Sequence, residues 1–165
     1  MEDSSIQVLI VGAGIVGLTV ARKLVETGFD HIGIIEKEPD VGYHASGRNS
    51  GVLHAGIYYA PDSVKATSCL RGNLKMQQYC RDKELPFENT GKVLEPGDLA
   101  PSAKAGIRAQ LVDWQTKELV QDFCLLKNGV SLHILNPVSP AFTSSMDLAE
   151  KIVDEFNTMI GGSGK

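Results

Sequence analysis

Residues 6–36 restrict the fold of this chain more than any other segment. An apolar run, 6–11, leads without a break into GAGIVG at 12–17, and apolar residues then recur at helical spacing as far as Gly28. A second apolar run, 31–36, ends in an acidic residue. Two buried strands joined by a helix within about thirty residues are typical of a right-handed βαβ unit with parallel strands.

The glycine pattern in this unit predicts a dinucleotide site. Gly12 permits a tight turn, Gly14 lets the backbone approach a pyrophosphate, and Gly17 lets the helix pack closely on the strand. Glu36 lies 19 residues after the last glycine, where a carboxylate accepts hydrogen bonds from ribose hydroxyls and repels a 2′-phosphate. A βαβ unit without a ligand is the alternative. The candidate cofactor-binding residues here are Gly12, Gly14, Ile15, Val16, Gly17, Glu36 and Lys37.

Length and charge exclude several classes of protein. The 165 residues are enough for about one domain, and 16 basic against 20 acidic residues give a net charge of −4. We therefore expect no nucleic-acid partner, and the apolar runs are far short of the ~18 residues that a membrane span needs. The acidic N-terminal residues favour a cytoplasmic location. Three cysteines without C-x-x-C spacing favour neither a disulfide framework nor a metal site.

The middle of the chain reads as a loop, a helix and a linker. Residues 42–56 carry glycines and small polar residues without periodicity, and Asp62 or Ser63 can cap a helix that runs to about Lys83. Leu70 and Leu74 are expected on the buried face of this helix, near Val64, Ala66 and Tyr79. We expect a short strand at 91–95 and a linker at 96–105.

The last third predicts strands followed by a helix. Residues 107–112 and 119–126 read as strands, and Asn128-Gly129 predicts a hairpin whose returning strand is 130–135. Ser144 or Ser145 can cap a final helix that buries Leu148, Ile152, Phe156 and Ile160.

Two long motifs resemble one enzyme family. The first is GRNSGVLHAGIYY at 47–59, followed by Pro61, Ser63 and Lys65-Ala66; the second comprises 105–110, 122–123 and LHILNPVSPAFTSS at 132–145. Both resemble the L-2-hydroxyglutarate dehydrogenase or oxidase family of FAD-dependent enzymes, in the D-amino-acid-oxidase-like superfamily. The resemblance covers most of the chain.

The resemblance implies a single Rossmann-like α/β FAD-binding domain over residues 1–165. Residues 1–95 and 106–160 would be its N- and C-terminal parts, 96–105 a linker in place of the antiparallel sheet that covers the substrate in the family, and 161–165 a tail. The parallel sheet would contain 6–11, 31–36 and 130–135, with helices on its faces and a small β-hairpin or meander beside it. A designed, truncated or spliced form would each fit this arrangement.

The resemblance also implies where the cofactor lies. The 42–56 loop would run beside the ribityl chain and flavin, and the positive N-terminal end of the last helix would face the flavin's pyrimidine edge. Arg48 stands where relatives carry histidine. His54 is the candidate catalytic or flavin-tuning residue, and a purely structural role is its alternative. The further cofactor-binding candidates are Ser46, Arg48, Asn49, Ser50, Gly51, Ser139, Pro140, Ala141, Thr143 and Ser144.

The implied function is that of an FAD-binding flavoprotein related to enzymes that oxidise L-2-hydroxyglutarate to 2-oxoglutarate. We expect little or no turnover, because the groups that hold the substrate's two carboxylates belong to the sheet that is absent here. One alternative is an active small FAD-dependent 2-hydroxy-acid oxidoreductase. Another is an NAD-binding Rossmann domain. The sequence leaves the oligomeric state open.

Overall fold

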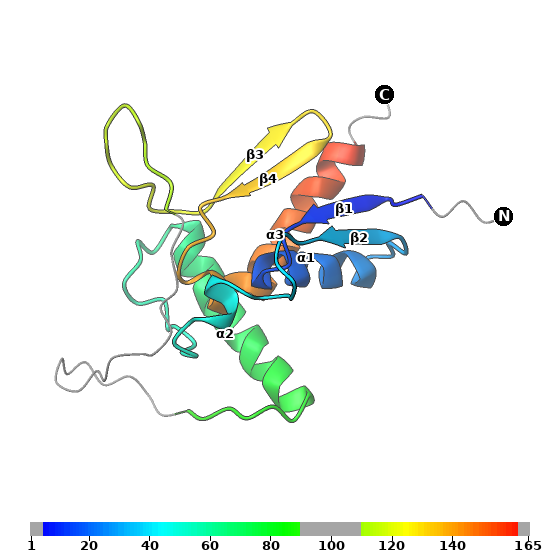
Figure 1. Cartoon of the computed structure of the whole chain (residues 1–165). Coiled ribbons are helices and arrows are strands. Elements are labelled where there is room, and N and C mark those ends of the chain that lie inside the picture. The colour runs from blue at the N-terminus through cyan, green and yellow to red at the C-terminus, as the bar shows by residue number, and fades with distance from the viewer. Residues whose placement is uncertain (1–4, 90–109, 162–165) are drawn as a thin grey trace.

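The computed structural model describes residues 5–89 and 110–161, which form a layer of helices beneath two small sheets (Figure 1). The helices and strands, in chain order, are β1 (Val8–Val11), α1 (Ile15–Glu26), β2 (Ile32–Ile35), the 3₁₀ helix η1 (Ala45–Gly47), α2 (Val64–Asp82), β3 (Cys124–Asn128), β4 (Ser131–Leu135) and α3 (Ala141–Gly161).

The predicted βαβ unit is confirmed. β1 and β2 pair in parallel, with Val8 opposite Ile32 and Val11 opposite Ile35. α1 connects the two strands and ends before Gly28, whose φ of +99° suits the residue after a helix. On the face of the β1–β2 sheet that points away from α1, Val11 is 79% exposed.

The hairpin prediction is confirmed, but the predicted three-stranded parallel sheet is wrong. β3 and β4 pair antiparallel around Gly129, which adopts φ +57°, and Cys124 lies opposite Leu135. β4 therefore takes its backbone hydrogen bonds from β3 rather than from β1, and the two pairs form separate sheets.

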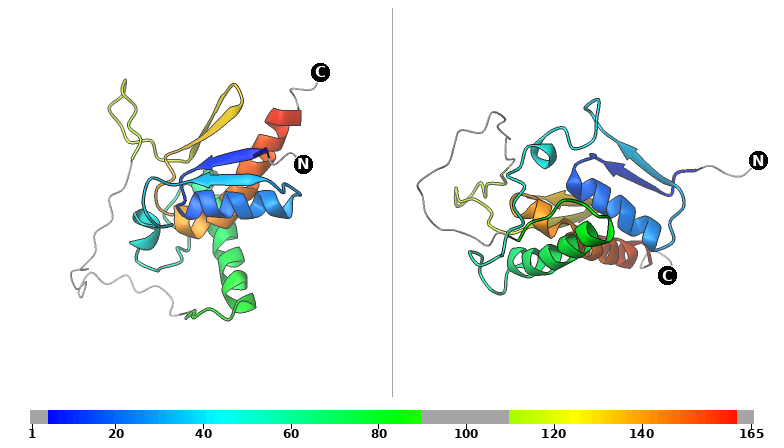
Figure 2. Two further views of the ribbon diagram at one scale, coloured as in Figure 1. Left: turned by 45° about the vertical axis from the view of Figure 1, so that its right-hand side comes forward. Right: turned by 90° about the horizontal axis from the view of Figure 1, so that it is seen from below.

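One apolar core lies under both sheets (Figures 1 and 2). Its buried centre comes from α1 and α3, and the inward-facing residues of both strand pairs pack against it. The central residues are Val20, Leu24, Leu148, Ala149, Ile152 and Val153; the strand residues packed on them include Val8, Ile10, Ile32, Leu125, Leu132 and Ile134. Burial of this shared face holds together two strand pairs that are each marginal alone.

The predicted strands at 107–112 and 119–126 are largely wrong within the described residues. Val112 and Leu119 form only an isolated bridge, and strand structure begins at Cys124. The Asn136 side chain explains the difference, because its amide donates to Val120 O and Asp122 O at 2.7 and 2.8 Å. The Asn136 side chain thus bonds to backbone carbonyls that would otherwise accept hydrogen bonds from a neighbouring strand. The predicted strand at 91–95 and the linker at 96–105 lie outside the described residues.

α2 forms as predicted but turns a different face inward. Ser63 caps it by accepting a hydrogen bond from the Ala66 amide at 3.0 Å, whereas Leu70 and Leu74 are each 59% exposed. The buried face carries Lys65, Ser68, Cys69, Gly72 and Met76. The small residues of this face, Ser68, Cys69 and Gly72, allow α3 to approach closely. The stability gained from this close packing outweighs the stability that burial of the leucine face would give.

α3 begins three residues before Ser144, the first of the two predicted caps. Its first residue is Ala141, and the Ser144 amide donates to Pro140 O at 2.9 Å, so Ser144 and Ser145 lie inside the first turns and are fully buried. Leu148 and Ile152 are buried as expected, but Ile160 is 45% exposed.

Candidate functional site

The glycine turn between β1 and α1 has the geometry that its sequence predicts. Gly12 has a φ of +107°, which side chains other than hydrogen strongly disfavour. A Cβ on Gly17 would lie 2.0 Å from Gly12 O and 3.4 Å from Ile10 Cγ2. The helix can therefore begin this close to the strand only because residue 17 has no side chain.

Backbone amides converge at the start of α1. The Leu18 amide is bonded to Gly14 O at 3.0 Å, so the amides of residues 15–17 precede that first helical hydrogen bond and point out of the helix end. Ser46 Oγ accepts from the Ile15 amide at 2.9 Å. The Val16 and Gly17 amides are thus left without a helical acceptor at the positive end of the helix dipole, an arrangement that suits an anion.

Glu36 lies at the mouth of the same turn. Its Oε2 accepts from the Ala13 amide at 2.7 Å, and its Oε1 accepts from the Glu38 amide at 3.0 Å. The bond from Ala13 and then that from Glu38 hold the pKa of Glu36 below its usual range. The carboxylate is fixed and ionised, and each oxygen keeps a second lone pair for a ligand hydroxyl.

The loop after β2 folds back over the glycine turn. Gly42 N donates to Ala13 O at 2.9 Å, and Ser46 reaches the start of α1. Asn49 steadies the loop, because its Nδ2 donates to Ser46 O at 2.6 Å and its Oδ1 accepts from the Gly51 amide at 2.8 Å. Ser50 and Gly51 are exposed in the same loop.

A charged cluster borders this loop. Lys37 contacts both Glu38 and His44, and His44 Nε2 lies 2.6 Å from Glu38 Oε1. Lys37 first and His44 second hold the pKa of Glu38 below its usual range. The guanidinium of Arg48 lies 5.3 Å above the Tyr43 ring. Lys37 and Arg48 therefore lie near the turn but are engaged by neighbours.

The second group of predicted residues lies at the start of α3. His54 is half-buried, and its amide donates to Thr143 Oγ1 at 3.0 Å. Thr143 and Ser144 are fully buried, Pro140 and Ala141 are buried, and Ser139 is partly exposed. The side chain of Thr143 thus supports His54 from within the fold, and the side chain of Ser144 is buried next to it in sequence.

The two groups lie at the same end of the molecule. α1 and α3 begin on that side in each view, and the carboxyl ends of β1 and β2 point toward it (Figures 1 and 2). This edge of a parallel sheet is where open α/β folds bind ligands.

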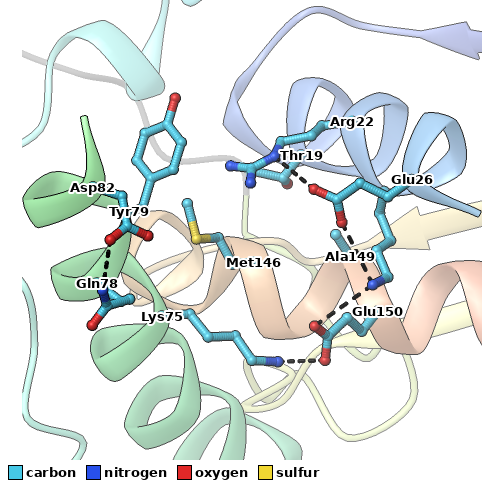
Figure 3. A pocket seen from close by; sticks show the side chains of 11 residues that line it. Thr19, Arg22, Glu26, Lys75, Gln78, Tyr79, Asp82, Met146, Ala149 and Glu150 are labelled. Carbon is cyan, nitrogen blue, oxygen red and sulfur yellow. Dashed lines mark hydrogen bonds and ion pairs between the residues drawn. The ribbon is translucent and has the colours of Figure 1, made fainter.

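A separate open groove of about 290 Å³ lies among α1, α2 and α3 (Figure 3). It contains none of the predicted site residues, and its charges pair with one another: Arg22 with Glu26 at 2.9 Å, and Lys75 with Glu150. We place the candidate site at the glycine turn, because that turn combines open helix amides with a fixed carboxylate.

Two residues that hold the site were not among the predicted site residues. Asn73 of α2 donates from Nδ2 to His54 O at 3.0 Å. Asp122 caps α2 by accepting from the Val64 and Lys65 amides at 2.7 and 2.9 Å. No local pattern marks Asn73, because it projects from a helix face that sequence periodicity assigns to solvent.

Residues 5–89 and 110–161 are the part of the chain that the structure describes. In that part of the chain, no group of three metal-binding side chains comes together. None of its helices combines the length and the apolar content needed to cross a bilayer.

Comparison with known families identifies the lineage. Residues 7–137 match the sequence model described as DAO, FAD dependent oxidoreductase. The chain belongs to this family. The match includes the glycine turn, Glu36 and His54, and extends through β4.

Several curated relatives of the chain are named L-2-hydroxyglutarate dehydrogenase. The mitochondrial L-2-hydroxyglutarate dehydrogenase of Pongo abelii is 44% identical over 97 residues, which cover 56% of this chain and 22% of the relative. L-2-hydroxyglutarate dehydrogenases of Indibacter alkaliphilus and Salmonella houtenae are 43% and 41% identical, over 53% and 52% of this chain and 22% and 21% of their own lengths. The resemblance found in the sequence is confirmed. The chain spans about a fifth of the length of these relatives. Because some relatives are mitochondrial, the cytoplasmic location stays a prediction.

Proposed function

We propose that this chain binds FAD with the pyrophosphate at residues 12–17 and the adenosine ribose at Glu36. The observation that carries the proposal is the glycine turn, where open amides of α1 and the fixed Glu36 carboxylate lie side by side. The space in front of Gly12 is open, since a Cβ there would meet nothing within 4 Å. The residues present therefore fit a dinucleotide.

The remaining predicted residues receive complementary roles in this proposal. Val16 and Gly17 offer amides to the phosphates, the Ile15 amide holds Ser46 beside them, and Lys37 and Arg48 add positive charge nearby. Ser46, Asn49, Ser50 and Gly51 line the path from the phosphates toward the flavin. Ser139, Pro140 and Ala141 bring the positive end of α3 to the flavin, with Thr143 and Ser144 buried behind them.

We further propose that turnover of L-2-hydroxyglutarate is negligible. FAD, when bound, supplies the hydride acceptor for oxidation of a 2-hydroxy acid. In this proposal His54 accepts the hydroxyl proton, but one imidazole does not hold a substrate with two carboxylates. The relatives devote about four fifths of their length to regions outside this match, and loss of substrate positioning lowers rates by orders of magnitude.

A flavin titration tests the cofactor assignment. FAD added to the purified chain should lose fluorescence saturably, whereas NAD should bind much more weakly. Gly14→Val should abolish FAD binding, because even its Cβ would lie 3.2 Å from Ser46 Oγ. Glu36→Arg should weaken it by removing the ribose acceptor. Gly161→Val is the matched control, since a Cβ at Gly161 meets nothing within 4 Å. Unchanged FAD affinity in folded Gly14→Val would reject the assignment.

Anaerobic mixing tests the turnover proposal. Loaded protein mixed with L-2-hydroxyglutarate should keep its flavin absorbance over seconds. Substrate-saturable bleaching that disappears in His54→Ala would instead establish an active small oxidoreductase.

A further inference from the structure

The backbone of His54 is held from both sides by two helices. Its amide donates to Thr143 Oγ1 of α3 at 3.0 Å. Its carbonyl accepts from Asn73 Nδ2 at 3.0 Å and from Cys69 Sγ at 3.3 Å, both of α2. Three side chains far away in sequence thus fix the peptide groups on either side of one residue within an otherwise irregular segment.

Each of these three side chains is itself held. Thr143 and Cys69 are fully buried, and Asn73 Oδ1 accepts from Gln77 Nε2 at 2.5 Å, which orients its amide. Burial raises the pKa of the Cys69 thiol to about 11, so the thiol stays protonated and can donate. The contacts to His54 therefore come from groups with little freedom to move.

The helices that carry these side chains are in direct backbone contact. A Cβ on Gly72 would lie 2.3 Å from Thr143 O and 2.7 Å from Ser144 Cα. Gly72 precedes Asn73 in sequence, so the closest approach of α2 and α3 lies beside the Asn73 and Thr143 contacts. Any change in the separation of the helices would be transmitted to both sides of His54.

We propose that Thr143 and Asn73 are positioning residues that set the location of His54 relative to the bound flavin. This inference rests on the proposed FAD function, and it assigns Thr143 to the His54 backbone rather than to the cofactor. These contacts fix the position of the His54 backbone, from which the imidazole extends. Displacements of about 1 Å at a reacting centre change rates by about a hundredfold.

We call the contacts from Cys69, Asn73 and Thr143 to the His54 backbone the clamp. Amide exchange and flavin spectroscopy test it. The variant is Thr143→Val, which removes the hydroxyl acceptor and keeps the shape of the side chain. In the FAD-free protein, hydrogen exchange at the His54 amide should accelerate about tenfold, while the Leu24 amide in α1 exchanges as in the wild type. In the loaded protein, the visible flavin circular dichroism should change, and FAD should bind about fivefold more weakly. Thr143→Ser, which keeps the hydroxyl, should restore all three properties.

Two further variants complete the design. Asn73→Leu removes the donor to His54 O and should reproduce the change in flavin circular dichroism, which keeps the proposal testable if Thr143→Val does not fold. Thr158→Val is the matched control on α3, because within residues 5–89 and 110–161 Thr158 Oγ1 bonds only to its own helix, to Asp154 O at 2.9 Å. Wild-type exchange and spectra in Thr143→Val or in Asn73→Leu would overturn the clamp. Failure of the wild-type chain to bind FAD would instead reject the proposed function on which the clamp rests.

Discussion

The β1–α1–β2 unit is built by contacts close in sequence, whereas the α2–α3 pair depends on contacts between distant parts of the chain. Gly17 packs on Gly12, and the Glu36 carboxylate reaches Ala13, 23 residues away. Between α2 and α3, Lys151 reaches Ser68 across 83 residues. The proposed phosphate position is therefore specified by residues close in sequence, whereas the position of His54 depends on assembly of the whole fold.

The largest effect is expected at Gly17 in the local unit. Gly17→Ala places a Cβ 2.0 Å from Gly12 O, so α1 cannot dock on β1 without moving. We expect a loss of at least about 4 kcal/mol in the free energy of unfolding, measured by urea denaturation followed by circular dichroism. The control Gly161→Ala should change this value by less than about 0.5 kcal/mol. If Gly17→Ala were as stable as the wild type, the turn would tolerate a wider spacing between α1 and β1.

A smaller and more selective effect is expected at Gly72. Gly72→Ala puts a Cβ 2.3 Å from Thr143 O, which should separate α2 from α3 at a loss of about 3 kcal/mol. Native-state hydrogen exchange should show faster exchange in α2 while the amides of α1 stay protected. Equal losses of protection in α1 and α2 would contradict the distinction between the local and the distant contacts.

The ion pairs of Asp147 should make the α2–α3 contact sensitive to acid. Asp147 is 2% exposed and accepts from Lys151 at 2.5 Å and Lys75 at 3.3 Å. Burial alone raises the pKa of Asp147, but the bonds from Lys151 and Ser68 outweigh burial and hold that pKa below its usual 3.8. A lowered pKa contributes stability that is complete above the unfolded value and is lost as the pH falls through the folded value.

Asp147→Asn tests this contribution. At pH 7 we expect a loss of about 2 kcal/mol, which is less than for a fully buried pair because each lysine is 34% exposed. Urea denaturation from pH 7 to pH 3 should show a shallower acid loss in the variant than in the wild type. Parallel curves for the two proteins would refute the role of Asp147.

The smallest effect is expected at the hairpin. Gly129 has φ +57° and open space around it, so Gly129→Ala introduces backbone strain alone, about 1 kcal/mol. Gly129→Asn should lose less, because asparagine tolerates this conformation. Thermal unfolding of the two variants measures the difference, and equal losses would show that strain is not the cause.

The sequence predicts those features that depend on neighbouring residues. The βαβ unit, the turn at Asn128-Gly129 and the cap at Ser63 all follow from local patterns, and all are present. The glycine turn belongs to the same class, because Gly12, Gly17 and Glu36 lie within one supersecondary unit.

Features decided by distant partners were not predictable. Leu70 and Leu74 form the apolar stripe of α2, yet Gly72 turns the opposite face toward Thr143 of α3. Asn136 supplies hydrogen bonds where strands were expected. Asn73 reaches His54 only because α2 takes that orientation, so no pattern along the helix identifies it as part of the site.

Amide chemical shifts during a titration with FAD test the central claim most directly. If the glycine turn is the cofactor site, the largest shifts should occur at Gly14, Val16 and Gly17, with a second group at His54. They should saturate together at one equivalent of FAD. Shifts concentrated in the groove among α1, α2 and α3, or no saturable shifts at the glycine turn, would contradict the account.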